Sequence, residues 1–329
     1  MISQMISASL ATLCLINSAV AAPLKRSTSG PHITSDFPDP SILRVGSTWY
    51  ALGTQSLFDY KNVHIQVASS SDFNNWGLWQ GTDALPNLPS WVDSSDPRVW
   101  APDVIQVGDH YVLYFSAASN FDGGYHCVGI ATSNSITGPY TPSDEPFACP
   151  TGQGGAIDAA GFVESDGTRY VVYKIDANAK GHGGSCNNGV QPILSTPIML
   201  QKVGSDGISK IDGPVQILAN EAEDGPLVEA PSLIRDGSGK YILFYSSGCF
   251  VDDSYTTKYA TSSSPYGPFT RASNNPLLST GKNGLHGPGG LDAGLDGVHV
   301  AFHGRSANGD GRRFMYTGII SADDTTVTV

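Results

Sequence analysis

The sequence has little positive charge. Lys and Arg together number 18 against 30 Asp and Glu, so the formal net charge is −12 at pH 7. Charged residues of both signs make up only 15% of the chain. An acidic protein repels the phosphate groups of nucleic acids and of anionic membranes. We therefore expect neither nucleic acid nor membrane as a partner, and we expect a neutral substrate.

Several catalytic motifs are also missing. There is no G-x-G-x-x-G opening a helix, no P-loop, no H-E-x-x-H and no nucleophile elbow. These absences argue against dinucleotide-dependent enzymes, P-loop NTPases, zinc proteases of that class and α/β-hydrolases. Helical periodicity is weak along the whole chain, which disfavours helical folds.

A long apolar run occurs only at the start of the chain. Residues 10–16 are apolar and are followed by Ala19-Val20-Ala21, an A-x-A cleavage pattern, although no Lys or Arg precedes them. The pair Lys25-Arg26 is typical of a dibasic processing site. We therefore expect residues 1–22 to be a signal peptide, residues 23–30 a short pro-segment and linker, and residues 31–329 one domain of a secreted, extracellular protein.

The cysteines fit that compartment. Cys14 lies in the expected signal peptide, and the other four contain no C-x-x-C pair, which disfavours a zinc site. Four cysteines allow three pairings. We favour Cys127–Cys149 and Cys186–Cys249 and expect no free thiol in the mature protein.

One pattern recurs along the chain. It is clearest in residues 227–248, where the carboxylate of Glu229 precedes a proline, an apolar strand-length segment, a glycine-containing turn and a second apolar segment. Related copies follow one another at intervals of 61, 59, 71 and 59 residues, measured between Tyr50, Tyr111, Tyr170, Tyr241 and Val300. A length of 329 residues suggests about two domains. A period of about 60 residues with roughly four strands per repeat instead predicts one all-β domain, a five-bladed β-propeller of four-stranded antiparallel blades.

Three of the repeats begin with a carboxylate. Asp39 lies 11 residues before its marker tyrosine, and Asp158 and Glu229 each lie 12 residues before theirs. Equivalent positions in a propeller stand at one height around the central channel, so we expect the three side chains to face one another at one mouth. Crowded carboxylates push one another's pKa values apart, which provides one acid and one base at neutral pH.

The chain resembles glycoside hydrolase family 43, which comprises five-bladed propellers that cleave arabinofuranosyl and xylosyl linkages in plant polysaccharides. The resemblance runs from about Pro31 to the C-terminus. The segments that carry it are Asp36-Phe37-Pro38-Asp39-Pro40-Ser41-Ile42, Trp100-Ala101-Pro102-Asp103-Val104, Gly155-Ala156-Ile157-Asp158 and Val228-Glu229-Ala230-Pro231.

The resemblance implies a role for each carboxylate. Asp39 would be the general base that activates water, Glu229 the general acid that protonates the leaving oxygen, and Asp158 the residue that tunes the pKa of Glu229 and orients it. It also makes Trp100, Asp103, His303 and Arg305 candidates for contacts with the substrate.

The sequence departs from the family in the fifth blade. Many members place a His after a glycine turn there, where it holds a central calcium or water, but this chain has Gly290 at that position. His286 or His303 is the candidate that could replace it. We assign no metal ligand and expect no required cofactor, with a structural calcium in the channel as the alternative.

These observations predict a secreted, monomeric, inverting glycosidase that acts on α-L-arabinofuranosyl bonds of arabinan or arabinoxylan. A β-xylosidase of the same family is the alternative, since the two sugars present similar stereochemistry around the scissile bond. Rivals of other kinds are a carbohydrate-binding propeller without catalysis and a retaining, fructosyl-transferring propeller. Exo and endo action both stay open.

Overall fold

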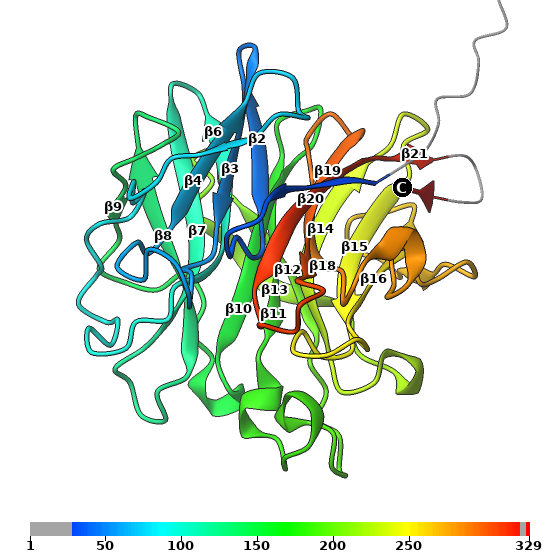
Figure 1. The fold of residues 1–329 in the computed structure, drawn as a ribbon. Coiled ribbons are helices and arrows are strands. Elements are labelled where there is room, and N and C mark those ends of the chain that lie inside the picture. The colour runs from blue at the N-terminus through cyan, green and yellow to red at the C-terminus, as the bar shows by residue number, and fades with distance from the viewer. Residues whose placement is uncertain (1–27, 323–326) are drawn as a thin grey trace, which may run out of the picture.

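The computed structural model describes residues 28–322 and 327–329. Within them the chain forms five four-stranded antiparallel sheets arranged around a central channel, and no α-helix (Figure 1). The prediction of a five-bladed propeller is therefore confirmed. The expected signal peptide lies outside the described residues. No helix in the described part of the chain has the length and apolar character needed to cross a membrane.

Four blades are continuous in sequence, and each runs from its innermost to its outermost strand. Their strands are β2 (Ser41–Val45), β3 (Thr48–Gly53), β4 (Gln66–Ser70) and β5 (Gly77–Leu78); β6 (Trp100–Val107), β7 (His110–Ala118), β8 (His126–Ser133) and β9 (Thr141–Pro142); β10 (Ala156–Val163), β11 (Arg169–Ile175), β12 (Ile198–Val203) and β13 (Lys210–Leu218); and β14 (Val228–Arg235), β15 (Tyr241–Ser247), β16 (Thr256–Ser262) and β17 (Thr270–Arg271).

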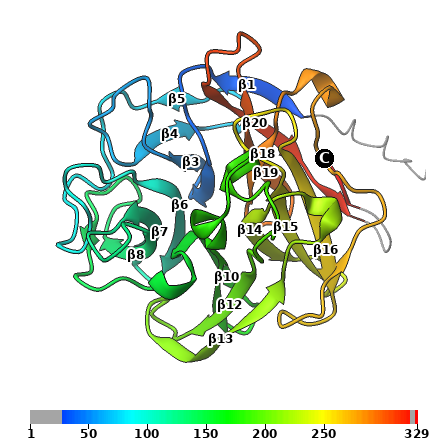
Figure 2. The same cartoon turned by 90° about the horizontal axis from the view of Figure 1, so that it is seen from below.

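The fifth blade joins the two ends of the chain. Its inner strands are β18 (Gly289–Ala293), β19 (His299–Arg305) and β20 (Arg313–Ile319), and its outer strand is β1 (Ser29–Ile33) from the N-terminal side. Figure 2 shows β1 in blue beside β20 in red. This pairing covers the edge of β20 with a strand from the other end of the chain. Strand β1 begins at Ser29, inside the segment that we expected to be a pro-segment and linker. A separate two-stranded ribbon, β21 (Ser321–Ala322) with β22 (Val327–Thr328), follows the propeller.

The hairpin turns explain why the repeats fold locally as predicted. In the turn between β14 and β15, Asp236 Oδ1 accepts hydrogen bonds from the backbone N–H groups of Ser238 and Lys240. Gly239 has a φ of +91°, a conformation that costs glycine little and other residues more. The side-chain cap and the glycine together fix the reversal that pairs the two strands.

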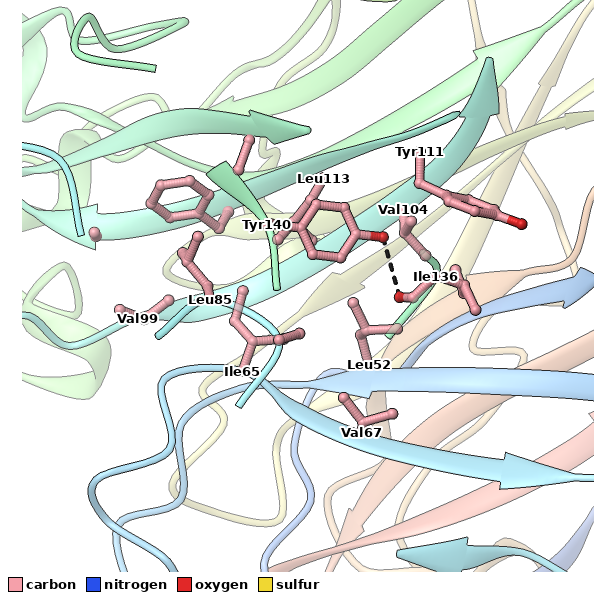
Figure 3. Packing of buried hydrophobic residues seen from close by; sticks show 14 of the residues in the cluster. Leu52, Ile65, Val67, Leu85, Val99, Val104, Tyr111, Leu113, Ile136 and Tyr140 are labelled. Atoms are coloured by element: carbon pink, nitrogen blue, oxygen red, sulfur yellow. Dashed lines mark hydrogen bonds between the residues drawn. The ribbon is translucent and has the colours of Figure 1, made fainter. Parts of the chain in front are cut away.

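The core lies between neighbouring blades. In the first interface, Leu52, Ile65 and Val67 of the first blade pack against Leu113 and Tyr140 of the second (Figure 3). The Tyr140 hydroxyl donates to the Ile136 carbonyl oxygen at 3.1 Å, so the buried phenol keeps a partner. Each such side chain contributes about 1.5–3 kcal/mol by leaving water. Because every blade is covered on two faces, strands in the middle of a blade, such as β7 and β15, are apolar on both.

The predicted disulfides are both present. Cys127–Cys149 lies within the second blade, and Cys186–Cys249 joins the loops that follow β11 and β15, in the third and fourth blades. The first of these loops contains two 3-10 turns, Ala177–Lys180 and Ser185–Asn187, and lies below the blades in Figure 1. The second disulfide therefore ties together two loops on one face of the propeller.

Candidate active site

A residue with left-handed backbone lies at the start of the innermost strand of every blade. The five residues have φ values between +41° and +58°, and they are Asp39, Ala101, Asp158, Ala230 and Gly290. Left-handed backbone costs a residue with a side chain on the order of 1–2 kcal/mol, and such strain gathers at functional sites. All five residues line the central channel. The propeller thus presents one residue per blade at the same level of the channel, and two of the five are aspartates.

Glu229 does not share this position. It directly precedes the strained residue Ala230, and the pairing of β14 with β15 shifts between Glu229 and Ser232. The expectation of three carboxylates in equal register is therefore right for Asp39 and Asp158 and wrong by one residue for Glu229. The reason is the strand pairing: Tyr170 pairs with Phe162, four residues after Asp158, whereas Tyr241 pairs with Arg235, five residues after Ala230, so the two marker tyrosines are not equivalent. Glu229 is only 8% exposed and is held by side chains of the third and fourth blades rather than lining the channel.

Asp39 is surrounded by donors and positive charge. Thr54 Oγ1 donates to its Oδ2 at 2.7 Å, Arg313 Nη1 lies 3.4 Å from both oxygens, and His303 Nδ1 lies 3.1 Å from Oδ1. Burial alone would raise the pKa of Asp39, but the charge of Arg313, the contact with His303 and the hydrogen bond from Thr54 outweigh it and hold the pKa well below its usual value. Asp39 is therefore an ionised carboxylate at neutral pH.

Asp158 has the opposite environment. Burial, followed by the negative charge of Glu229, raises its pKa well above the usual value, and Lys174 offsets this only in part. Its Oδ2 accepts a hydrogen bond from the Ala230 N–H at 2.9 Å, which links the third and fourth blades. One mouth of the channel thus holds two aspartates whose pKa values are moved in opposite directions.

Glu229 is gripped at both oxygens. The Tyr255 hydroxyl donates to Oε1 at 2.9 Å, and Lys174 Nζ donates to Oε2 at 2.9 Å. Lys174 is completely buried and also lies 3.0 Å from Asp176 Oδ1. The sequence analysis missed Lys174, Tyr255, Thr54 and Arg313. For Lys174 there was a signal, because a lysine directly follows the apolar run of residues 170–173.

Two of the expected substrate contacts come from the second blade. Trp100 is half-buried and stacks on His126, with ring centroids 3.7 Å apart. Asp103 is buried deeper in the channel, where Oδ1 accepts from Ser41 Oγ and Oδ2 accepts from the Gly161 N–H. Asp103 therefore links the first, second and third blades, and both its oxygens are occupied by the protein.

The other two expected contacts come from β19. His303 is fully buried and lies against Asp39, so it is placed to hold that carboxylate rather than to touch a sugar. Arg305 Nη1 forms an ion pair with Asp253 at 3.1 Å. The alternative metal candidate, His286, is exposed and lies 3.8 Å from Asp253 at the surface, away from the channel lining.

The donor set does not fit a metal held by side chains. In the described ranges no group of three or more His, Cys, Asp or Glu residues is arranged to hold an ion. Gly290 supplies no ligand, and His303 Nδ1 is engaged with Asp39, which leaves Nε2 as one nitrogen without a partner. Calcium requires six to eight oxygen ligands, so these residues give no basis for a calcium-dependent step.

Glycoside hydrolases use two carboxyl groups of opposite protonation state, one on each side of the scissile bond. The fold and the site therefore define a propeller glycoside hydrolase. The chain matches the model of Glycosyl hydrolases family 43 over residues 28–314, and it belongs to that family.

Curated relatives and solved structures agree with this membership. The extracellular endo-α-(1→5)-L-arabinanase 1 of Bacillus subtilis is 27% identical over 286 residues, covering 83% of this chain and 81% of that protein. The probable arabinan endo-1,5-α-L-arabinosidase A of Aspergillus flavus is 30% identical over 274 residues, covering 77% and 76%. The crystal structure of a thermostable family-43 glycoside hydrolase has a TM-score of 0.72 at 24% identity, covering 90% of this chain and 93% of that one, which shows the same fold.

Proposed function

We propose that this protein is a secreted, inverting glycosidase that hydrolyses α-L-arabinofuranosyl linkages of arabinan or arabinoxylan. The observation that carries the proposal is the electrostatic contrast at the channel mouth, with an ionised Asp39 beside a pair of buried carboxyl groups, Asp158 and Glu229. The arabinan-directed names of the relatives support the sugar, and the two disulfides support an oxidising compartment.

The proposed reaction is a single displacement. Asp39 accepts a proton from a water molecule while the oxygen of that water bonds to the anomeric carbon. The bond from the anomeric carbon to the leaving oxygen breaks in the same step. Glu229 gives its proton to the leaving oxygen. Asp158 accepts a hydrogen bond from the N–H of Ala230, the residue that follows Glu229, and this contact supports its role in orienting the acid. Contacts from His303, Arg313 and Thr54 keep Asp39 ionised and orient its carboxylate to accept the proton from water.

The test is an activity screen of the purified protein on debranched arabinan, arabinoxylan, a nitrophenyl arabinofuranoside and a nitrophenyl xyloside. We expect cleavage of the arabinose substrates, and NMR of the first product should show the anomer opposite to that of the substrate. Activity confined to the xyloside would replace arabinose by xylose as the substrate. Binding without cleavage on all four would refute the enzymatic proposal. Retention of configuration would refute the role of Asp39 as a base.

A further inference from the structure

Lys174 occupies a place where the strand pattern calls for an apolar side chain. Successive residues of a strand point to opposite faces. On β11, Tyr170 and Val172 pack in the cluster shared with the fourth blade, whereas Val171 and Tyr173 pack in the cluster shared with the second. Lys174 continues the first face, so its side chain points toward β14 and reaches Glu229. A fully buried lysine in such a place is retained only if its charge is compensated.

Two carboxylates compensate it. Lys174 Nζ lies 2.9 Å from Glu229 Oε2 and 3.0 Å from Asp176 Oδ1. Burial would lower the pKa of Lys174, but Glu229, Asp176 and Asp158 together raise it above the usual value, so the ammonium stays charged throughout the working pH range. One permanent cation therefore stands against one oxygen of Glu229.

The two oxygens of Glu229 are unequal for this reason. An ammonium group can only donate hydrogen bonds, whereas a tyrosine hydroxyl can either donate or accept. A proton on Oε2 would meet a group that cannot accept it. A proton on Oε1 meets the Tyr255 hydroxyl or a substrate oxygen. We propose that Lys174 is a positioning residue that fixes the carboxyl plane of Glu229 and confines its transferable proton to Oε1.

This inference rests on the proposed role of Glu229 as the acid, so the experiment measures both. Initial rates are compared on a linear arabino-oligosaccharide, whose leaving alkoxide needs protonation, and on its nitrophenyl glycoside, whose phenolate leaves unaided. Glu229→Gln should lose on the order of 10²–10⁴-fold on the oligosaccharide and little on the aryl substrate. Lys174→Met should show the same selectivity, with a loss of about tenfold or more on the oligosaccharide and less than about threefold on the aryl substrate.

The chain offers a matched control. Lys258 is also buried, is 8% exposed and donates to Asp224 at 2.9 Å, but it has no contact with the three carboxylates. Lys258→Met removes an equivalent ion pair and should leave the ratio of the two rates at its wild-type value. If Lys174→Met does not fold, the double variant Lys174→Met/Asp176→Asn removes one buried charge of each sign and gives the same readout.

Three results decide the matter. A selective loss in the Lys174 variant but not in the Lys258 variant supports the proposal. An equal loss on both substrates, or an unchanged ratio, overturns it if Glu229→Gln is selective in the same assay. If Glu229→Gln itself shows no selectivity, the acid assignment fails and the inference about Lys174 fails with it.

Discussion

Replacing Gly290 by alanine tests whether the fifth blade holds Asp39, the proposed general base, in place. A Cβ at Gly290 would lie 2.7 Å from His303 Nδ1 and 2.8 Å from Asp39 Oδ1, whereas ordinary contacts begin at 3.4 Å. One or both groups must therefore move by more than half an ångström. Misplacement of a reacting group by about 1 Å can cost about 10²-fold in rate. We expect Gly290→Ala to lower kcat by about tenfold or more.

Gly108→Ala is the matched control for this change. Both glycines have a φ of +58°, but a Cβ at Gly108 meets nothing within 4 Å. Each alanine therefore costs about 1–2 kcal/mol from left-handed backbone. Only Gly290→Ala adds a steric conflict, which should lower the free energy of unfolding by a further 1–3 kcal/mol, roughly. Thermal unfolding should show a smaller loss of Tm for Gly108→Ala and a larger one for Gly290→Ala.

Activity separates the two variants. Because the proposed mechanism requires Asp39 to activate water in every turnover, Gly290→Ala should lose the same factor on the oligosaccharide and on its nitrophenyl glycoside. Gly108→Ala should keep wild-type rates on both. Wild-type kcat in Gly290→Ala, with a Tm equal to that of Gly108→Ala, would show that the contacts of His303 and Asp39 with Gly290 do not position the base. A loss on the oligosaccharide alone would place the effect at the acid instead.

Three further outcomes are expected. Asp39→Asn should be inactive on both substrates, in contrast to the selective loss in Glu229→Gln, and the reverse pattern would exchange their roles. Burial and a neighbouring arginine lower the pKa of His126 from 6.5 to about 4. Between these two pH values the unfolded chain binds a proton that the folded protein does not. The free energy of unfolding should therefore fall by on the order of 3 kcal/mol as the pH drops from 6.5 to about 4. Denaturant unfolding of His126→Asn at several pH values should show a shallower fall. Replacing both Cys186 and Cys249 by serine should cost about 2–4 kcal/mol in chemical unfolding, and the wild type should show no reactive thiol when denatured without reductant; an unchanged unfolding midpoint would mean that the loop disulfide is not a stabilising link.

The architecture could be predicted because each blade repeats its own local signals. The turn at residues 236–239 and the apolar strands beside it need no distant partner to be recognised. The closure of the fifth blade by β1 could not be found in this way, because residues 29–33 carry no copy of the repeat. Their place depends on pairing with β20, almost 300 residues away in the chain, which no local pattern encodes.

The site was predictable only in its carboxylates. Asp39 and Asp158 stood out because they begin repeats, and Glu229 because it precedes a proline in the same pattern. Their partners come from other strands and other blades: Arg313 is 274 residues from Asp39, and Lys174 is 55 residues from Glu229. The one-residue offset of Glu229 also escaped, since the marker residues Tyr170 and Tyr241 occupy different positions in the pairing of their strands, which the amino-acid pattern does not reveal.

The glycine pair of the fifth blade shows why a departure from a family pattern has to be interpreted with the neighbours in view. A Cβ at Gly289 would lie 2.0 Å from Tyr255 Cε1, and a Cβ at Gly290 would lie 2.7 Å from His303 Nδ1. The first glycine makes room for the phenol that contacts Glu229, the proposed acid, and the second makes room for the imidazole that contacts Asp39, the proposed base. The absence of a histidine at residue 290 is therefore not a gap in the site. The side chains of His303 on β19 and of Tyr255 just before β16 fill the space that a Cβ at residues 290 and 289 would need, and they reach Asp39 and Glu229.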